Sequence, residues 1–314
     1  MHVPTLLPDE LVGGYLSRLA HLNAATSGEA VLNAMYRSPD RPRGGVACPT
    51  PFELIAQVAG VDKKLLLCAH SLAPLQMAIQ AERDPIQHGD PLNRRFERRL
   101  RRDVSDPGLW RCPRCVREDL IFWGFAYSRR SAQLPGVDWC TKHGCLLQRT
   151  SSCLGEEATP VALTTAEARY ADIMGALFDL RLSIPLTQAS IRLRNRGEQL
   201  GVRVRRDRAG RTMSNLVTSA MPRRWLQRHR PWLLSGGCIS LDNIQTRPVN
   251  PFALQDYVLA LTALYNTADE ALSDFLRPLD AAEQFRVDDL ARRRCGHRPA
   301  ELRVEVELKE TARQ

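Results

Sequence analysis

Apolar residues spaced three and four positions apart predict helices along most of the chain. One such stripe near the N-terminus comprises Leu11, Tyr15, Leu19 and Leu22. Side chains at this spacing share one helical face, and Asp9 ahead of them is a candidate N-cap. The first hundred residues are therefore predicted to be helical.

Three later helices begin with recognisable start signals. A Thr followed three residues later by Glu forms a capping box, and Asn before Pro suits an N-cap followed by the first helical position. These signals are Thr164 with Glu167, Asn250 with Pro251, and Thr267 with Glu270. The apolar stripes behind the first two signals are Ile173, Leu177 and Leu180, and Val258, Leu261 and Tyr265.

Residues 50–72, TPFELIAQVAGVDKKLLLCAHSL, have the pattern of a helix-turn-helix motif. This motif needs a small residue, a turn glycine and two core residues. The chain supplies them as Ala56, Gly60, Val61 and Leu66. The second helix offers few polar side chains that could reach base edges in DNA. Packing against protein is thus favoured over sequence reading for this unit.

The predicted fold class is mainly α, with a small α/β module in the middle of the chain. The turn VSDPG at 104–108 ends the first helical unit. The expected units are an N-terminal helical unit with the helix-turn-helix-like segment at 1–106, a central zinc-finger module at 107–160, an arginine-rich helical unit at 161–245 and a C-terminal helical unit at 246–314.

The charge distribution adds an expected acidic partner to this picture. The 314 residues carry a net charge of +9, and the segment 190–230 alone holds 12 Arg against Glu198 and Asp207, or 12 − 2 = +10. Clustered arginine is typical of proteins that contact nucleic acid phosphates. The candidate contacts to nucleic acid or to a partner are Arg192, Arg194, Arg196, Arg203, Arg205, Arg206, Arg208, Arg211, Arg223 and Arg224.

A second interpretation of this cluster is a solvated or protein-facing surface. The chain has 40 Arg and four Lys. That ratio is typical of a GC-rich genome, so arginine as a residue type carries little information. The concentration of arginine within 190–230 is what favours nucleic acid contact.

The sequence indicates a cytoplasmic protein without membrane contact. No apolar run approaches the roughly 20 residues that span a bilayer. The N-terminus MHVPTLLPDE lacks the basic start and apolar core of a signal peptide. In a reducing cytoplasm, nine cysteines suggest metal ligands or buried thiols rather than disulfides.

Four residues with metal-ligand chemistry occur in two short turns. Cys112 and Cys115 form CPRC, Cys140 and His143 form CTKH, and 24 residues lie between the turns. A set of three Cys and one His suits tetrahedral zinc. Four protein ligands leave no open position for water, so we expect one structural zinc ion and no catalytic one.

Other features also argue against an enzyme and against a second zinc site. A zinc deaminase would need a glutamate where Cys145 stands. The chain shows no nucleophile–base pair, paired carboxylates or phosphate-cradling loop. The remaining cysteines lack a matching ligand set: Cys48, Cys68, Cys145, Cys153, Cys238 and Cys295, the last near His297.

Further short motifs surround the two turns. Between CPxC and CxxHG lie a Gly followed by a Tyr, paired Arg, and QLPG, while PDE at 8–10 and SRLA at 17–20 stand near the N-terminus. The residues concerned are Gly124, Tyr127, Arg129, Arg130, Gln133, Leu134, Pro135, Gly136 and Gly144, with the four candidate ligands. This combination resembles the TniQ family of transposon target-selection proteins, over about residues 4–150 and loosely to about 265.

The chain departs from the family pattern at a few positions. The family usually has an aromatic residue before the paired Arg and a His before QLPG, where this chain has Ser128 and Ala132. These changes leave the candidate ligands intact but alter the inner face beside them. Many members carry a further cysteine pair, and Glu156 stands where its second Cys would be, which favours one zinc.

The resemblance implies a non-catalytic adaptor for DNA transposition. Family members recognise or bridge to the insertion site and recruit an AAA+ ATPase regulator, which engages the transposase. Some read target DNA directly, and others dimerise on an RNA-guided CRISPR effector, Cascade, with its guide RNA. A homodimer is compatible with the resemblance, and the sequence leaves the targeting mode open.

The alternative function is a stand-alone, zinc-stabilised regulator that binds DNA sequence-specifically. It would require tight duplex binding with a strong salt dependence. The combined N-terminal and QLPG–CxxH patterns favour the adaptor, because a generic zinc protein would lack them.

Overall fold

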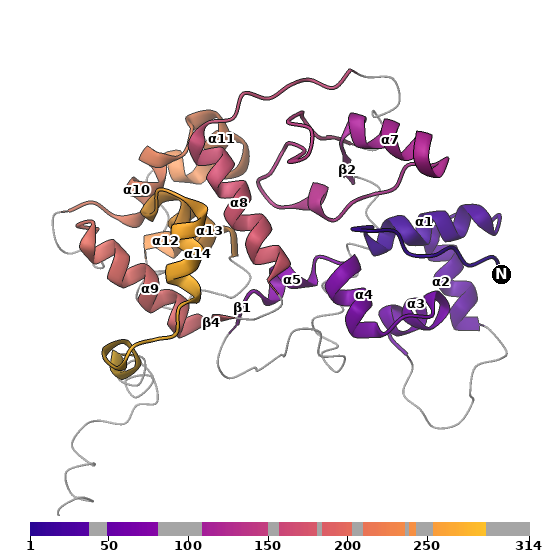
Figure 1. Cartoon of the computed structure of the whole chain (residues 1–314), viewed down its shortest axis with the longest axis horizontal. Helices are drawn as coiled ribbons and strands as arrows, with labels where there is room; N and C mark the ends of the chain where they lie inside the picture. Colours follow the sequence, from indigo (N-terminus) through magenta and orange to yellow (C-terminus); the bar gives the residue numbers. More distant parts are fainter. Residues whose placement is uncertain are drawn as a thin grey trace, which may run out of the picture.

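The structure is a computed structural model that describes residues 1–37, 49–80, 109–149, 157–180, 184–202, 210–235, 239–242 and 254–286. Within these residues the chain is mainly helical, with two short two-stranded sheets. The predicted fold class is thereby confirmed. The described residues of 1–70 gather at one end of the molecule and the described residues of 184–286 at the other, with 109–149 beside the first group (Figure 1).

The N-terminal unit contains α1 (Val12–Leu22), α2 (Gly28–Arg37), α3 (Pro51–Ala59), α4 (Lys63–His70) and the short α5 (Ala73–Met77). Their apolar faces meet in one core. Its fully buried members include Tyr15, Leu16, Leu19, Phe52 and Ile55. Leu22, which was expected on the same stripe as Tyr15, is 49% exposed at the end of α1.

The helix-turn-helix pattern corresponds to α3, a tight turn and α4. Thr50 and Glu53 form a capping box at the start of α3. Gly60 ends this helix with φ 66°, a left-handed conformation that favours glycine. Asp62 then caps α4 by accepting hydrogen bonds from the backbone of its first turn. Ala56 and Leu66 are buried as predicted, and Val61 is half-buried.

The start of α1 differs from the prediction. Leu11, rather than Asp9, occupies the N-cap position, and its side chain makes no capping hydrogen bond. Asp9 has φ 57° and directs its carboxylate away from the helix, onto Ser131. Asp9, which has the sequence pattern of a helix cap, therefore contacts a segment that lies far along the chain.

The central module combines one helix with a small antiparallel ladder. Strand β2 (Trp110–Arg111) pairs with β3 (Gln148–Arg149), and α7 (Pro113–Trp123) follows β2 directly. The turn η1 (Ser131–Gln133) lies between them in sequence. This arrangement is the small α/β module that the sequence predicts.

The C-terminal helices share one apolar core. They are α8 (Thr165–Asp179), α9 (Leu186–Gln199), α10 (Met213–Ala220), α11 (Arg223–His229), η2 (Pro231–Ser235), α12 (Ile239–Asp242), α13 (Leu254–Leu264) and α14 (Ala268–Leu276). Helix α13 lies at the centre, where Tyr257 to Leu261 are completely buried and contact α8, α9, α10 and α14. The expected units 161–245 and 246–314 thus contribute to the same core.

A short parallel ladder joins the first half of the chain to this core. Strand β1 (Ile79–Gln80) pairs with β4 (Ile184–Pro185), and α5 packs against α8. Ile79 and Ile184 are both buried there. The segment after α4 therefore anchors the N-terminal unit to the C-terminal helices.

The helix-start signals have mixed outcomes. The capping box of Thr164 and Glu167 is present. Thr267 accepts from the Glu270 backbone, but the Glu270 carboxylate accepts from Asn266 instead of completing a box. Asn250 and Pro251 lie outside the described residues. In the part of the chain that the structure describes, each helix is too short or too polar to cross a membrane.

Candidate metal centre

The CPRC turn brings two thiols together because it is the start of a helix. Cys112 is the N-cap of α7 and Pro113 occupies the first turn, where its missing N–H costs nothing. The Cys115 backbone donates to Cys112 Sγ at 3.4 Å. Both sulfurs consequently lie on the same side of the helix start.

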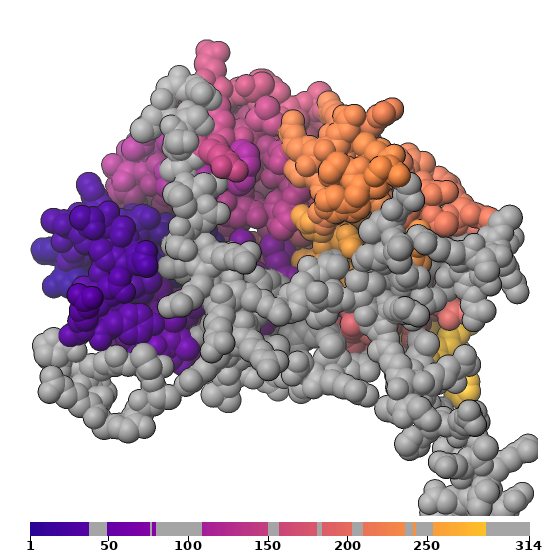
Figure 2. Space-filling model, turned by 180° about the vertical axis from the view of Figure 1, so that it is seen from behind, coloured from indigo at the N-terminus to yellow at the C-terminus, as the bar shows by residue number. Residues whose placement is uncertain are grey.

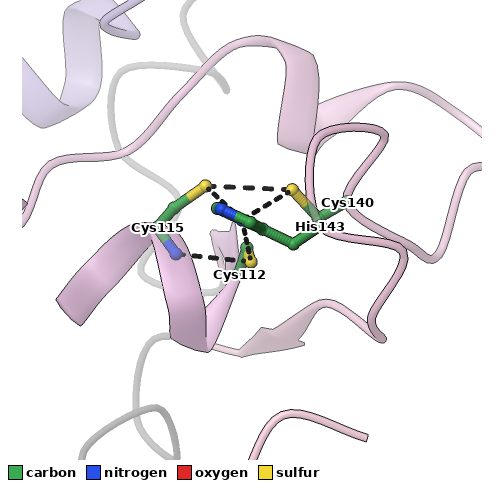
Figure 3. A group of neighbouring side chains, drawn as sticks. All are labelled: Cys112, Cys115, Cys140 and His143. Atoms are coloured by element: carbon green, nitrogen blue, oxygen red, sulfur yellow. Dashed lines mark hydrogen bonds between the residues drawn. The ribbon is translucent and has the colours of Figure 1, made fainter. Parts of the chain in front are cut away.

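The second turn presents its ligands from the opposite side of the centre. The Gly144 N–H donates to the Cys140 carbonyl at 2.8 Å, and Gly144 has φ 58°. This tight reversal points Cys140 and His143 toward α7, as Figure 3 shows. Glycine suits the position after His143 because the turn requires a left-handed residue.

The four donor atoms match the geometry of tetrahedral zinc. Bonds of about 2.3 Å to sulfur and about 2.0 Å to nitrogen imply S···S distances of about 3.8 Å and S···N distances of about 3.5 Å. The sulfurs of Cys115 and Cys140 are 3.8 Å apart. His143 Nδ1 lies 3.3, 3.4 and 3.6 Å from the sulfurs of Cys112, Cys115 and Cys140. All four donors fall within 4.8 Å of one another, so this set could hold a metal ion.

The acid–base properties of the cysteines also favour a bound cation. Hydrogen bonds from Cys115 and Cys140 lower the pKa of the Cys112 thiol, so a thiolate forms there readily. The same hydrogen bond raises the pKa of Cys115, because a second negative charge beside Cys112 is unfavourable. A divalent cation would remove this penalty for all three sulfurs.

Glu118 orients His143, the candidate histidine ligand. Its Oε1 lies 2.9 Å from His143 Nε2, and its Oε2 accepts from Lys142 Nζ at 2.6 Å. A carboxylate on one ring nitrogen fixes the tautomer and leaves the other nitrogen free for a metal. The sequence pattern did not indicate Glu118, although its position one helical turn after Cys115 would place it beside the centre.

Cys145 lies behind the centre as a neutral thiol. Its Sγ is 3.4 Å from Cys112 Sγ and its side chain is buried. Burial and the Cys112 thiolate raise the pKa of Cys145 to about 12, so it can donate a hydrogen bond to Cys112. Its backbone carbonyl accepts from Cys140 N at 2.8 Å and steadies the second turn.

The PDE motif joins the N-terminal unit to the central module. The Asp9 carboxylate accepts from Ser131 N and Oγ and from Arg130 Nε, at 2.6–3.1 Å. Arg130 continues across the joint to the carbonyl of Cys68, at the end of α4, at 2.7 Å. One arginine of the predicted pair thus connects three segments of the chain.

Glu10 is fully buried beside this joint and is also satisfied. Its carboxylate forms a two-point ion pair with Arg18 at 2.6 and 2.7 Å. Its backbone carbonyl lies 3.0 Å from His70 Nδ1. The PDE and SRLA motifs therefore have a shared structural role, because Arg18 comes from the second of them.

The QLPG motif packs the central module against the C-terminal helices. Tyr170 on α8 donates to the Pro135 carbonyl, and Trp225 on α11 donates to the Gly136 carbonyl, both at 2.9 Å. Gly136 has φ 78°, and a β-carbon there would lie 2.8 Å from Trp225 Cζ2 and from Tyr170 OH. Gln133 pairs with both backbone groups of Trp110 and holds β2 in place.

The two departures from the family pattern lie at this inner face. Ser128 is fully buried, and its Oγ accepts from Arg111. A β-carbon on Gly14 of α1 would lie 3.3 Å from Ser128 Cβ, so α1 approaches Ser128 closely. Ala132 lines a cavity of about 150 Å³ beside the candidate ligands, together with Tyr127 and Arg129.

One predicted contact residue lies inside the fold and requires a correction. Arg192 is 1% exposed on the inner side of α9. Its guanidinium donates to Glu283 at 2.6 Å and to the carbonyls of Arg277 and Pro278. Arg192 therefore stabilises the C-terminal helices and has no charge to offer an outside partner.

Two more of the predicted contacts have partners within the chain. Arg194 bonds Glu198 one turn later at 2.8 Å. Arg196 bonds Glu270 at 2.8 Å and lies over the Tyr265 ring. Arg203, Arg205, Arg206 and Arg208 lie outside the described residues.

The remaining predicted contacts gather around α10 and α11. Arg211, Arg223 and Arg224 are exposed, and Arg224 keeps a 62% exposed side chain while donating to Glu167. Arg228 on the same helix, 65% exposed and bonded to Asp138, was not singled out from the sequence. Figure 2 shows residues 210–235, in orange, standing out at the edge of this face.

The comparison with known families concerns the N-terminal unit and the central module. A family model described as TniQ matches residues 2–147. This range includes α1 to α5, the joint at Asp9 and Arg130, and the four candidate ligands. No curated protein matches the chain.

Proposed function

Because residues 2–147 form a TniQ domain, whose family is associated with target-site selection in transposition, we propose that this protein is a non-catalytic target-site selection adaptor. It links target DNA, or an RNA-guided Cascade effector bound to it, to an AAA+ regulator and through that regulator to a transposase. The TniQ family consists in general of adaptors rather than enzymes.

One structural observation carries the adaptor proposal beyond the family match. Groups of the family motifs are engaged within the fold: Asp9 with Arg130 and Ser131, Glu10 with Arg18, and the Gly136 carbonyl with Trp225. Groups used this way hold parts of a scaffold together and are not available for proton or acyl transfer. Such a scaffold suits a protein that positions partners.

Zinc is the metal that we propose for the centre, with a structural role. Three thiolates and one imidazole are the donors that zinc prefers, and four protein ligands complete its tetrahedron. Bound there, the ion would supply folding free energy by tying the start of α7 to the turn at 140–143. Cys112, Cys115, Cys140 and His143 would be its ligands.

The exposed arginines around α11 are the proposed nucleic acid surface in the described part of the chain. Arg211, Arg223 and Arg224 remain candidates because their charges face solvent. Each phosphate contact contributes a slope of about −0.9 to the dependence of log affinity on log salt. Arg203, Arg205, Arg206 and Arg208 remain candidates from sequence.

The test is a transposition assay combined with purification of the tagged protein from cells that carry the complete transposon. We expect loss of insertion at the selected site when the gene is removed, and co-purification of the AAA+ regulator with the wild-type chain. Bound guide RNA would assign the Cascade mode, and its absence the direct DNA mode. Normal insertion without the gene would refute the adaptor.

A triple variant tests whether the exposed arginines around α11 bind DNA without a role in folding. Changing Arg211, Arg223 and Arg224 to Gln should weaken binding to a DNA duplex and reduce the salt slope by up to about three. The melting temperature should stay within about 2 °C, because the side chains are exposed. Unchanged DNA binding would show that this face contacts protein or solvent instead.

The alternative, a stand-alone DNA-binding regulator, makes an opposite prediction. The purified chain alone would then bind one duplex sequence tightly, and its removal would change transcription without affecting insertion. The match to TniQ favours the adaptor over this alternative.

A further inference from the structure

The last turn of α7 exposes a run of four apolar side chains. Ile121 is 81% exposed and Phe122 76%, while Leu120 and Trp123 are 44% and 40% exposed. Phe122 and Trp123 contact each other edge to face, with ring centroids 4.7 Å apart. Single exposed apolar residues are common on protein surfaces, but a run of consecutive ones indicates an interaction surface.

Helical periodicity shows that this turn is apolar on more than one side. The side of α7 that faces the metal centre carries Cys115 and Asp119, and its next positions are Phe122 and Trp123. The outward side carries Arg114 and Arg117, and its next position is Ile121. The last turn of α7 thus presents exposed apolar side chains on more than one side.

The charged residues of α7 that have no ion-pair partner among the described residues are both positive. Arg114 and Arg117 are exposed, and within the described residues neither forms an ion pair. The acidic residues of the same helix are already engaged, Glu118 with Lys142 and His143, and Asp119 with Arg129. Among the described residues, the outward face therefore presents two positive charges without an ion-pair partner, and Ile121 follows them at the start of the exposed apolar run.

We propose that the C-terminal turn of α7 inserts into an apolar groove with an acidic rim on a partner protein. A helix end that is apolar on opposite sides is covered better by a groove than by a flat surface. Carboxylates at the rim would complement Arg114 and Arg117 and orient the helix. The proposal rests on the proposed function only in that an adaptor needs a protein partner.

The same features disfavour other occupants. Phosphates would pair with the arginines but leave Leu120 and Ile121 against water, since aliphatic side chains offer no stacking surface to bases. One helical turn is shorter than the apolar face of a helix that lies in a membrane surface. A symmetric pairing of two copies through α7 would bring no free carboxylate to Arg114 and Arg117, because Glu118 already binds Lys142 and His143.

Photo-crosslinking in the full chain tests the proposal. Phe122 is replaced with p-benzoylphenylalanine in cells carrying the complete transposon, and Phe285, 64% exposed on the C-terminal unit, is replaced as the matched control. We expect an adduct from position 122 to one protein. The crosslinked segment should be rich in Leu, Ile or Phe and flanked by Asp or Glu.

Two variants, one apolar and one of charge, test the two features of the contact. Ile121→Glu and the double variant Arg114→Glu with Arg117→Glu should each reduce the adduct at least tenfold. Leu200→Glu, a change at the exposed apolar residue that follows α9, should not. Metal content and melting temperature report on folding. If the double arginine variant fails to fold, the wild-type adduct is formed instead in a lysate of the same cells, where it should be lost between about 0.1 and about 0.5 M salt.

Each other outcome is decisive. Adducts to nucleic acid, to lipid or to a second copy of the chain would overturn the proposal, and so would an adduct no stronger than that from position 285. Insertion frequency is measured in the same cells. If insertion at the selected site is normal but no adduct forms from position 122, the groove contact is refuted and the proposed function stands. If the adduct forms to an acidic groove on a protein that is unrelated to transposition, the proposed function is refuted and the groove contact stands.

Discussion

At the scale of single residues, we expect the candidate metal centre to depend on Glu118 as well as on its four candidate ligands. Glu118 contacts His143 Nε2 at 2.9 Å and thereby leaves Nδ1 directed at the three sulfurs. Loss of an outer carboxylate of this kind typically weakens metal affinity about 10–100-fold. Cys115→Ser removes a ligand outright.

The corresponding prediction compares these two changes. We expect Cys115→Ser to lose bound zinc and Glu118→Gln to keep it at full zinc concentration but release it to a chelator about 10–100-fold more readily. Zinc analysis and competition with a coloured chelator measure both effects. Glu198→Gln, the same change on an exposed residue of α9, should match the wild type. Full zinc retention by Cys115→Ser would contradict the ligand assignment.

His70 should make the contact between α4 and the start of α1, beside the joint at Asp9 and Arg130, sensitive to acid. Burial lowers the pKa of His70, whose Nδ1 faces the Glu10 carbonyl. The unfolded chain therefore takes up the proton first as pH falls. The stabilising contribution is complete above the unfolded pKa of about 6.5 and decreases below it.

Urea denaturation at pH 7.5 and 5.5 checks this prediction under saturating zinc. The free energy of unfolding of the wild type should fall more steeply between these pH values than that of His70→Gln. Glutamine keeps a donor for the Glu10 carbonyl but does not titrate. Equal pH dependence of the two proteins would show that His70 does not contribute.

At the scale of elements, the QLPG turn fixes the spacing between the central module and helices α8 and α11. Gly136→Ala would force a β-carbon to within 2.8 Å of Trp225 and Tyr170 at a φ of 78°. Left-handed strain and overpacking together should cost about 2–4 kcal/mol of unfolding free energy. Gly201→Ala isolates the strain, because Gly201 has φ 70° with open space around it.

Chemical denaturation of both variants separates the two contributions. We expect Gly201→Ala to lose about 1–2 kcal/mol and Gly136→Ala clearly more. Equal losses would mean that Trp225 and Tyr170 move aside freely. The packing role assigned to QLPG would then be wrong.

The elements also show which features sequence patterns could predict. The CPRC and CTKH turns were predictable because each is a local motif whose spacing alone directs two donors to one point. The joint between Asp9 and Arg130 was not, since its partners lie 121 positions apart and Asp9 has the local pattern of a helix cap. Burial of Arg192 follows the helical period from Leu186 and Ala189, but its partner Glu283 lies 91 residues later.

At the scale of the whole molecule, arginine has two separate tasks. Arg192 is an internal cation that links α9 to residues 277–283, whereas Arg223 and Arg224 cover the outside of α11. A composition count cannot distinguish these tasks, because the same residue type serves both. Only burial and partners assign each arginine to the scaffold or to the surface.

Removing the internal arginine should be far more damaging than removing a surface one. Arg192→Met would leave Glu283 buried without its cation, at a cost of about 3–5 kcal/mol in unfolding free energy. Arg194→Met, which breaks an exposed pair with Glu198, should cost less than about 1 kcal/mol. Thermal unfolding compares the two, and Arg192→Met with Glu283→Gln should recover part of the loss. Similar stabilities for Arg192→Met and Arg194→Met would contradict the internal role.

The joint at Asp9 and Arg130 also bears on how the protein is made. Helices α1 to α4 enclose a core of their own and can assemble early during synthesis. Asp9 cannot meet Arg130 and Ser131 until those residues have left the ribosome, and the candidate zinc ligands are complete only at His143. The part of the chain that the TniQ model matches therefore closes late in translation, and uptake of the proposed metal and closure of the joint should coincide within the same short stretch of elongation.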